Sequence, residues 1–160
     1  MREKIFMAVY TTEITSESIP SDNPIHQRLL QAYVLATGFV HGDLLEVGCG
    51  EGRGIDWLLP KVKSYTAIDK IAPVIERLKS TYPQATFYAG NIPPLSVFQD
   101  NQFDTLVSFQ VIEHIQDDHL FLKEIHRILK PGGQALLTTP NRVMSLSRNP
   151  WHVREYTAPE

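Results

Sequence analysis

The sequence predicts an open α/β fold, in which a doubly wound, mostly parallel sheet carries helices on both faces. Short apolar runs alternate along the chain with longer segments whose apolar residues recur at helical spacing. This order is typical of parallel strands joined by crossover helices. A glycine-rich stretch, GCGEGRG, directly follows the first apolar run. Open sheets of this class bind ligands beyond the carboxyl ends of their strands, so the stretch lies where a ligand is expected.

The elements of the amino-terminal half follow in order. Residues 1–23 show no regular period and are expected to be a lead-in to one domain at 24–160. Apolar residues at helical spacing predict a helix within 23–40, with Gly38 near its end. Buried strands are expected at 42–48, 64–69 and 85–90, and further helices at 52–62 and 71–83.

The carboxyl-terminal half continues the same alternation. Strands are expected at 103–110 and 134–140, and an amphipathic helix at 117–133, ended by a proline and two glycines. The tail EYTAPE predicts the start of another helix, with Thr157 as N-cap and Glu160 as its capping-box partner.

Composition excludes several classes of protein. The net charge is −3 and the charges are interspersed, so neither a nucleic acid nor an anionic membrane is an expected partner. Cys49 is the only cysteine, which excludes an internal disulfide and a multi-cysteine zinc site, and it is expected to be a small filler. The first ten residues are too short and too charged for a signal peptide, and no run is long enough to span a membrane. We therefore expect a cytoplasmic protein.

The spacing of the glycines limits the choice of ligand. A dinucleotide fingerprint, G-x-G-x-x-G, would need a glycine at Arg53 or at Ile55. The lysine and hydroxyl residue of a triphosphate-binding loop are also missing. The pattern is instead an acid and three glycines at every second position, carried by Glu46, Gly48, Gly50 and Gly52.

On these residues, the sequence resembles the class I S-adenosylmethionine-dependent methyltransferases, and among them the small-molecule group whose first motif reads EVGCGEG. The resemblance extends over 43–141 and includes YTAID, YAGNIPPL, FDTLVSFQVIEHI and LKEIHRILKPGGQALLTTPN. It implies a Rossmann-like fold, S-adenosyl-L-methionine as cofactor, and methyl transfer to a small-molecule acceptor by in-line displacement, mainly through positioning. Two alternatives remain: a non-catalytic or degenerate module that binds the cofactor, and, less favoured by the glycine spacing, an NAD(P)-dependent oxidoreductase.

The resemblance also implies roles for single residues. Asp69 closes the second strand and is expected to accept the ribose hydroxyls, although it could instead cap the next helix. Asn91, where the family often has an acid, and Ile92 are expected at the adenine, and Phe109 and Gln110 at the methionine end. Glu46 could contact the cofactor or accept from amides of its own loop. The full set of candidate cofactor-binding residues is Glu46, Gly48, Cys49, Gly50, Gly52, Asp69, Lys70, Asn91, Ile92, Phe109 and Gln110.

Two histidines are candidates for the acceptor side. The stretch EHIQDDH suggests a metal site, but acids favour a helix start, and the family carries an acid–His pair here without a metal, so no metal is expected. His114 of this stretch is a candidate catalytic residue. His152, in the aromatic tail, is a candidate general base. Its alternative role is structural, with the tail residues capping the edge of the sheet.

The chain contains fewer strands than the family it resembles. Family members have seven strands, and the sequence predicts only five, so strands six and seven are expected to be missing and the domain to be truncated at its carboxyl terminus. The exposed sheet edge would then favour a homodimer or aggregation. We expect such a chain to keep the cofactor half of the site and an incomplete acceptor pocket.

Overall fold

The computed structural model describes residues 24–145 and 149–159. The predicted lead-in at 1–23 and the predicted capping partner Glu160 lie outside these residues. Within them the chain forms one five-stranded sheet in which all the strands run parallel. The strands are β1 (Asp43–Val47), β2 (Ser64–Asp69), β3 (Thr86–Ala89), β4 (Phe103–Phe109) and β5 (Leu129–Thr138).

The strand order is β3-β2-β1-β4-β5. From β1 the chain moves outward through β2 to β3, and then crosses back to place β4 on the other side of β1. The direction of winding therefore reverses between β1 and β4, which is the place where doubly wound sheets bind their ligands. This topology confirms the predicted fold class and the predicted five strands.

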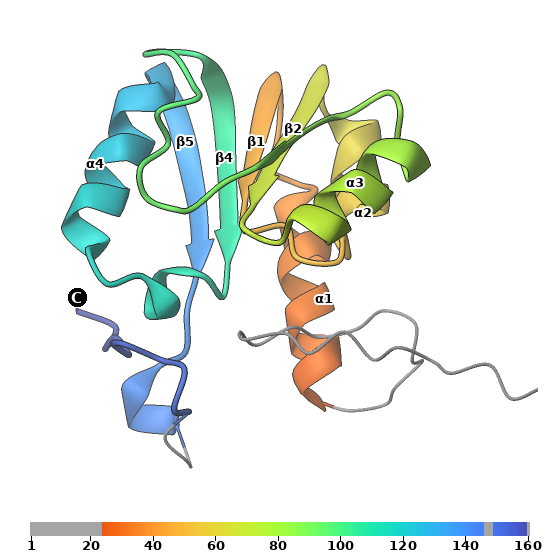
Figure 1. The fold of residues 1–160 in the computed structure, drawn as a ribbon. Coiled ribbons are helices and arrows are strands. Elements are labelled where there is room, and N and C mark those ends of the chain that lie inside the picture. The colour runs from red at the N-terminus through yellow and green to blue at the C-terminus, as the bar shows by residue number, and fades with distance from the viewer. Residues whose placement is uncertain (1–23, 146–148, 160) are drawn as a thin grey trace, which may run out of the picture.

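Helices cover both faces of the sheet (Figure 1). One apolar core joins β1 and β2 to α1 (Pro24–Ala36), α2 (Ile55–Leu58) and α3 (Ala72–Thr81). A second core lies on the other face, against α4 (Asp118–Ile128). Strand β1 serves both cores because successive side chains point to opposite faces: Leu44 packs into the first core and Leu45 into the second.

Two predicted helices are shorter than expected. Of the helix predicted at 52–62, only α2 forms, and the 3₁₀ turn η1 (Leu59–Lys61) follows it. The helix begins late because the glycine turn continues to Gly54, which is the N-cap, and it ends early where Pro60 lies in η1. The helix predicted at 117–133 ends at Ile128. The residues that follow belong to β5, which pairs with β4 through an irregular register between Phe103 and Thr105.

The helix start predicted at 155–160 stays a prediction, because the description ends at residue 159, within the first turn of that helix. Tyr156 forms an isolated parallel bridge to Asn141, and a turn follows it. The carbonyl of Tyr156 also accepts a hydrogen bond from Arg142 N at 2.8 Å, at the start of the 3₁₀ turn η3 (Arg142–Met144). These contacts hold the tail beside the carboxyl end of β5.

Strand β5 forms one edge of the described sheet. From Gly133 to Thr138 every residue of the strand is only partly buried, whereas the central strand β1 is almost fully buried. A sheet edge of this kind exposes backbone groups that can pair with another strand. None of the helices in the described part of the chain has the length and apolarity that a membrane crossing needs.

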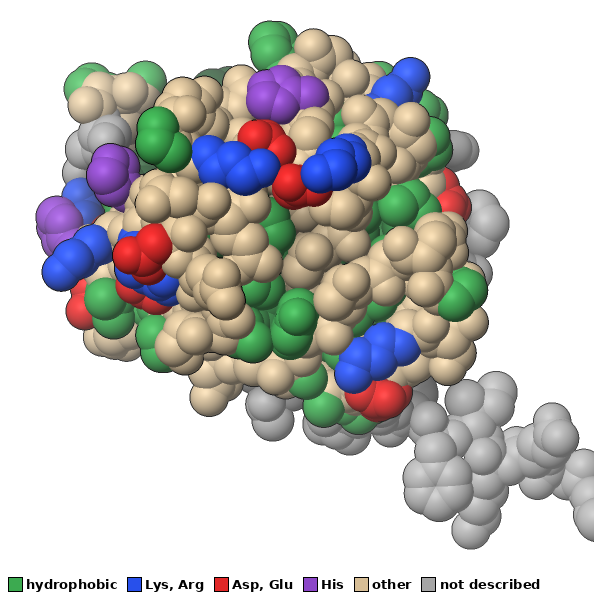
Figure 2. Space-filling model, turned by 90° about the horizontal axis from the view of Figure 1, so that it is seen from above, with side chains coloured by type: hydrophobic (Ala, Val, Ile, Leu, Met, Phe, Trp, Pro, Cys, Tyr) green, Lys and Arg blue, Asp and Glu red, His purple; other side chains and the backbone are tan. Residues whose placement is uncertain are grey.

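An ion-pair cluster closes the amino end of the sheet, where acidic and basic side chains lie side by side (Figure 2). Lys130 Nζ lies 3.0 Å from Asp43 Oδ2 and 2.8 Å from Asp104 Oδ2. Asp104 Oδ2 also accepts from the backbone N–H of Asp43 at 2.7 Å. The hydrogen bond from Lys130 is the main cause that lowers the pKa of Asp43 to about 2. The pKa of Asp104 is lowered too, first by the Asp43 N–H and then by Lys130.

Asp104→Ala is expected to lower the free energy of unfolding at neutral pH by about 1 kcal/mol, because it removes two charge-assisted hydrogen bonds. A carboxyl whose pKa is lowered by folding stabilises the protein above its unfolded pKa, about 3.9, and loses that contribution as the pH falls further. Urea titrations should therefore show that wild type and variant converge between about pH 4 and pH 2. A difference that stays constant over this range would contradict the assignment.

Candidate active site

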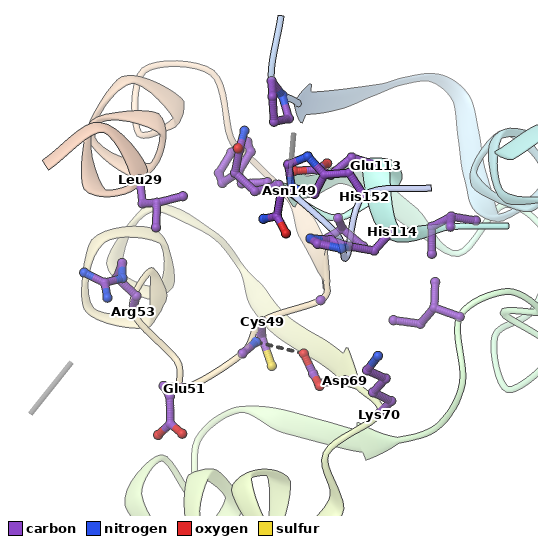
Figure 3. Close-up of a pocket in the computed structure, with 18 of the residues that line it drawn as sticks. Leu29, Cys49, Glu51, Arg53, Asp69, Lys70, Glu113, His114, Asn149 and His152 are labelled. Atoms are coloured by element: carbon purple, nitrogen blue, oxygen red, sulfur yellow. Dashed lines mark hydrogen bonds between the residues drawn. The ribbon is translucent and has the colours of Figure 1, made fainter. Parts of the chain in front are cut away.

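A cavity of about 420 Å³ lies at the carboxyl ends of the strands, at the reversal between β1 and β4. Its walls come from the glycine loop (residues 48–54), the ends of β2 and β4, α1, and the tail. Figure 3 shows Cys49, Asp69 and Lys70 on one side of this cavity and Glu113, His114 and His152 on another. The cavity therefore joins the two groups of residues that the sequence analysis placed at the cofactor and at the acceptor.

Asp69 ties the second strand to the glycine loop. Its Oδ2 accepts from the Gly50 N–H at 2.9 Å, the bond drawn as a dashed line in Figure 3. Its Oδ1 accepts from the Ile71 N–H at 3.1 Å, at the start of α3. The alternative role as helix cap is wrong, because the N-cap of α3 is Ile71 and no side chain caps the helix there. A carboxylate has about four lone-pair positions, so these two bonds leave capacity for hydroxyl donors in the cavity.

Gly50 has a φ of +50°, and a Cβ atom built there would meet nothing within 4 Å. Gly132, near the amino end of β5 and outside the cavity lining, has the same open surroundings at a φ of +81°. Gly50→Ala and Gly132→Ala should each lower the free energy of unfolding by about 1–2 kcal/mol, because both force an alanine into the left-handed backbone conformation.

Only Gly50→Ala should also weaken binding of the expected cofactor, by on the order of tenfold or more, because its methyl group would fill cavity space in which that ligand is expected. Calorimetric titration of both variants with S-adenosylhomocysteine checks this result. Equal affinities for the two variants would show that the loop backbone does not approach the ligand at Gly50.

Glu46 lies behind the cavity rather than in it. Its carboxylate is buried and accepts from Tyr33 Oη at 2.7 Å and also from Tyr65 Oη. Burial, and then the charge of Glu46, raise the pKa of both tyrosines well above 10, so both hydroxyls stay protonated donors. Tyr33 lines the cavity and packs edge-on against Phe109, with ring centroids 5.0 Å apart. Glu46 therefore acts on the cavity through Tyr33.

The end of β4 has an unusual backbone. Gln110 adopts a φ of +57°, which is uncommon for a residue with a side chain, and such conformations cluster at functional sites. Its N–H donates to the carbonyl of Thr138 at 2.8 Å and its side-chain amide to Thr138 Oγ1 at 3.3 Å. Strand β5 thus holds Gln110 in a fixed position at the rim of the cavity.

Most of the candidate residues meet at this cavity. Those that line it are Gly48, Cys49, Gly50, Asp69, Lys70, Ile92, Phe109, Gln110, His114 and His152. Glu46, Gly52 and Asn91 do not line it. Burial raises the pKa of the Cys49 thiol well above its usual value, which fits the predicted role as a filler.

Sequence reasoning missed a group of cavity residues from α1 and from the glycine loop. These are Arg28, Leu29, Tyr33, Glu51 and Arg53. The helix α1 was predicted, but its periodicity does not say which side chains turn toward the carboxyl end of the sheet. Arg53 stood within the quoted motif, and a guanidinium there suits a ligand that carries a carboxylate.

The histidine side of the cavity is built on η2 (Ile112–His114) and on the tail. The carboxylate of Glu113 is buried and accepts from Thr139 Oγ1 at 3.2 Å. Burial raises the pKa of Glu113, while its own backbone N–H and the nearby His114 and His152 oppose the rise. The two imidazole rings meet edge to face, with centroids 5.0 Å apart.

A family model described as a methyltransferase domain matches residues 45–137, more than half of the 160-residue chain. The chain belongs to this family. A protein of Mycolicibacterium smegmatis named as a probable S-adenosylmethionine-dependent methyltransferase is 38% identical over 123 residues. The matched part covers 74% of this chain and 48% of that relative, so the chain spans about half the length of the curated relatives it matches.

Solved structures confirm the methyltransferase fold. YcgJ from Bacillus subtilis superposes with a TM-score of 0.65 at 21% identity, over 84% of this chain and 64% of that one. The N-methyltransferase NodS from Bradyrhizobium japonicum, solved with S-adenosyl-L-homocysteine, gives 0.60 at 26% identity, over 73% and 63%. The resemblance to the S-adenosylmethionine-dependent methyltransferases is therefore confirmed, and S-adenosylmethionine is the cofactor of the family to which the chain belongs.

Proposed function

We propose that this chain binds S-adenosylmethionine in the cavity at the strand reversal and transfers its methyl group to a small-molecule acceptor. The observation that carries the proposal is the bond between Asp69 and the Gly50 N–H. It joins the acid at the end of β2 to the glycine loop after β1, and so forms one binding surface beside the reversal. A cavity of about 420 Å³ suits a small ligand rather than a polymer.

The described residues fit the cofactor. Asp69 supplies a carboxylate for the ribose hydroxyls, and the open surroundings of Gly50 let the backbone approach the ligand closely. Ile92, which lines the cavity, offers an apolar surface for the adenine. Asn91 lies outside the lining, next to Ile92, and its amide is proposed to reach the adenine edge. Phe109 and Gln110 lie at the methionine end in this arrangement, and Arg53, which also lines the cavity, carries a charge that suits the carboxylate.

Bound S-adenosylmethionine supplies a methyl group that is attached to a cationic sulfur. On transfer of the methyl group, this sulfur is the leaving group and becomes a neutral thioether. The chain has to hold an acceptor in line with that methyl group and to exclude water. Phe109 and Tyr33 form an apolar wall of the cavity for this purpose. His114 and His152 lie where they can orient a polar group of the acceptor and take up its proton.

The proposal is tested by calorimetric titration of the chain with S-adenosylmethionine and S-adenosylhomocysteine, followed by methyl transfer from radiolabelled cofactor to a panel of small acceptors. Binding of both nucleosides with transfer to at least one acceptor supports the proposal. Binding without any transfer supports a non-catalytic cofactor-binding module. A folded chain that binds neither compound contradicts the proposed function.

A homodimer through the outer edge of β5 is part of this proposal. The partial burial of 133–138 leaves that edge open to a second strand, and a second copy of the chain is one source of it. Analytical ultracentrifugation over a range of concentrations should show a monomer–dimer equilibrium. A chain that stays monomeric at millimolar concentration contradicts this part.

A further inference from the structure

The tail folds back onto η2 and places one histidine against another. The carbonyl of Glu113 accepts from the N–H groups of Val153, at 2.7 Å, and of Arg154, at 3.3 Å. These bonds hold the backbone of Val153 and Arg154 against η2. They thereby fix the position of His152, the residue directly before them. Its ring then meets that of His114 with centroids 5.0 Å apart.

Three side chains converge as a result. Glu113, His114 and His152 each offer one ligand atom, and these atoms all lie within 4.8 Å of one another (Figure 3). The residue Glu113 is only 1% exposed. A buried carboxylate is costly unless a positive charge or hydrogen bonds compensate it, and Thr139 supplies one such bond. A cation between the three side chains would compensate it further.

Both imidazoles are held in the tautomer that binds metals. His114 Nδ1 lies 2.9 Å from the carbonyl oxygen of Trp151, which can only accept, so Nδ1 carries the proton. His152 Nδ1 lies 2.7 Å from Glu155 Oε1, and the carboxylate again accepts. In the neutral ring the lone pair is then on Nε2. Metal-bound histidines usually donate their other N–H to a carbonyl or carboxylate in this way.

We propose that Glu113, His114 and His152 bind a divalent transition-metal ion, with Zn²⁺ and Co²⁺ as the best-suited ions. Two imidazoles and one carboxylate form a ligand set of catalytic zinc sites, which leave a coordination position open to water or substrate. The acceptor role of the ion rests on the proposed function. In that role a hydroxyl oxygen of the acceptor would take the open position. The ion would lower the pKa of this hydroxyl, and its proton would pass to water instead of to a histidine.

The sequence alone predicted no metal here, because the acids of 113–119 suit a helix start and the resembled family carries its acid–His pair without a metal. Asp118 of that stretch is engaged elsewhere: its Oδ2 accepts from Arg154 at 2.8 Å and from Tyr156 Oη at 2.9 Å. Asp117 caps α4 through the N–H of Leu120. The third ligand is instead His152, which the fold brings in from the tail.

The test uses Co²⁺ as the probe on the chelator-treated 160-residue chain, because its visible absorption reports nitrogen and oxygen ligands. We expect saturable 1:1 binding that Zn²⁺ reverses by competition. His114→Ala and His152→Ala should each weaken binding by on the order of 100-fold, and Glu155→Gln by about 10- to 100-fold through the orientation of His152. His119→Ala and His126→Ala, at exposed histidines on α4, should bind as the wild type does.

Circular dichroism checks that each variant is folded, and His152→Gln replaces His152→Ala if the latter unfolds. The cofactor provides an independent readout, because Asp69→Ala should weaken S-adenosylhomocysteine binding by on the order of 100-fold or more and leave the Co²⁺ spectrum unchanged. Cobalt binding without nucleoside binding therefore overturns only the proposed function. Nucleoside binding with no 1:1 cobalt spectrum, or with a spectrum that His152 variants leave unchanged, overturns the metal site.

Discussion

Asp69→Ala should reduce the affinity for S-adenosylhomocysteine by on the order of 100- to 1,000-fold. Hydrogen bonds to charged groups contribute about 1.5–3 kcal/mol each, and the substitution removes the carboxylate expected to accept from two ribose hydroxyls. It also removes the acceptor of the Gly50 N–H, so the glycine loop loses its tie to β2. The loss should appear in calorimetry at neutral pH.

Two further variants separate the ribose contact from the support of the loop. Asp69→Asn keeps an oxygen that can accept from the Gly50 N–H, and it should show an intermediate loss of about tenfold. Asp56→Ala, at an exposed aspartate of α2 outside the cavity lining, should bind as tightly as the wild type. A folded Asp69→Ala chain whose affinity falls less than about threefold would rule out a direct ribose contact.

The fold could be predicted because its signals are local. Each strand is a short apolar run, and α1, α3 and α4 show apolar residues at helical spacing, so their order along the chain determines the class of sheet. The errors occurred where long-range pairing overrides local pattern. Residues after Ile128 continue the helical pattern in sequence, but they extend because β4 offers its edge for pairing.

The candidate site was predictable only in part, for the same physical reason. The glycine loop, Asp69 and the end of β4 follow directly from strands, so their place at the carboxyl edge follows from topology. Tyr33 and Arg28 reach the cavity from α1, and a helix pattern alone does not define that orientation. Neither of the two roles left open for Glu46 anticipated the hydrogen bonds that it accepts from Tyr33 and Tyr65, because these partners come from α1 and β2.

Gly54→Ala should destabilise the fold strongly, by about 2–4 kcal/mol. Its backbone conformation, φ −87° and ψ −13°, is one that any residue can adopt, so the effect comes only from the steric overlap of the added Cβ atom. A Cβ atom there would lie 1.9 Å from Tyr33 Cε1. Tyr33 has little freedom to move, because its ring packs on Phe109 and its hydroxyl donates to Glu46. Overpacking of 1–3 kcal/mol therefore adds to a weakened buried hydrogen bond.

A double-mutant cycle shows whether this contact is the cause. Tyr33→Leu alone should destabilise the chain, because it leaves a gap and removes one partner of the buried Glu46. In the Gly54→Ala background the same change also relieves the clash, so the two effects should be less than additive by at least about 1 kcal/mol. Chemical denaturation of the four chains measures this coupling. Additive effects would show that the helix start after the glycine loop, rather than the packing of Tyr33, requires a glycine at position 54.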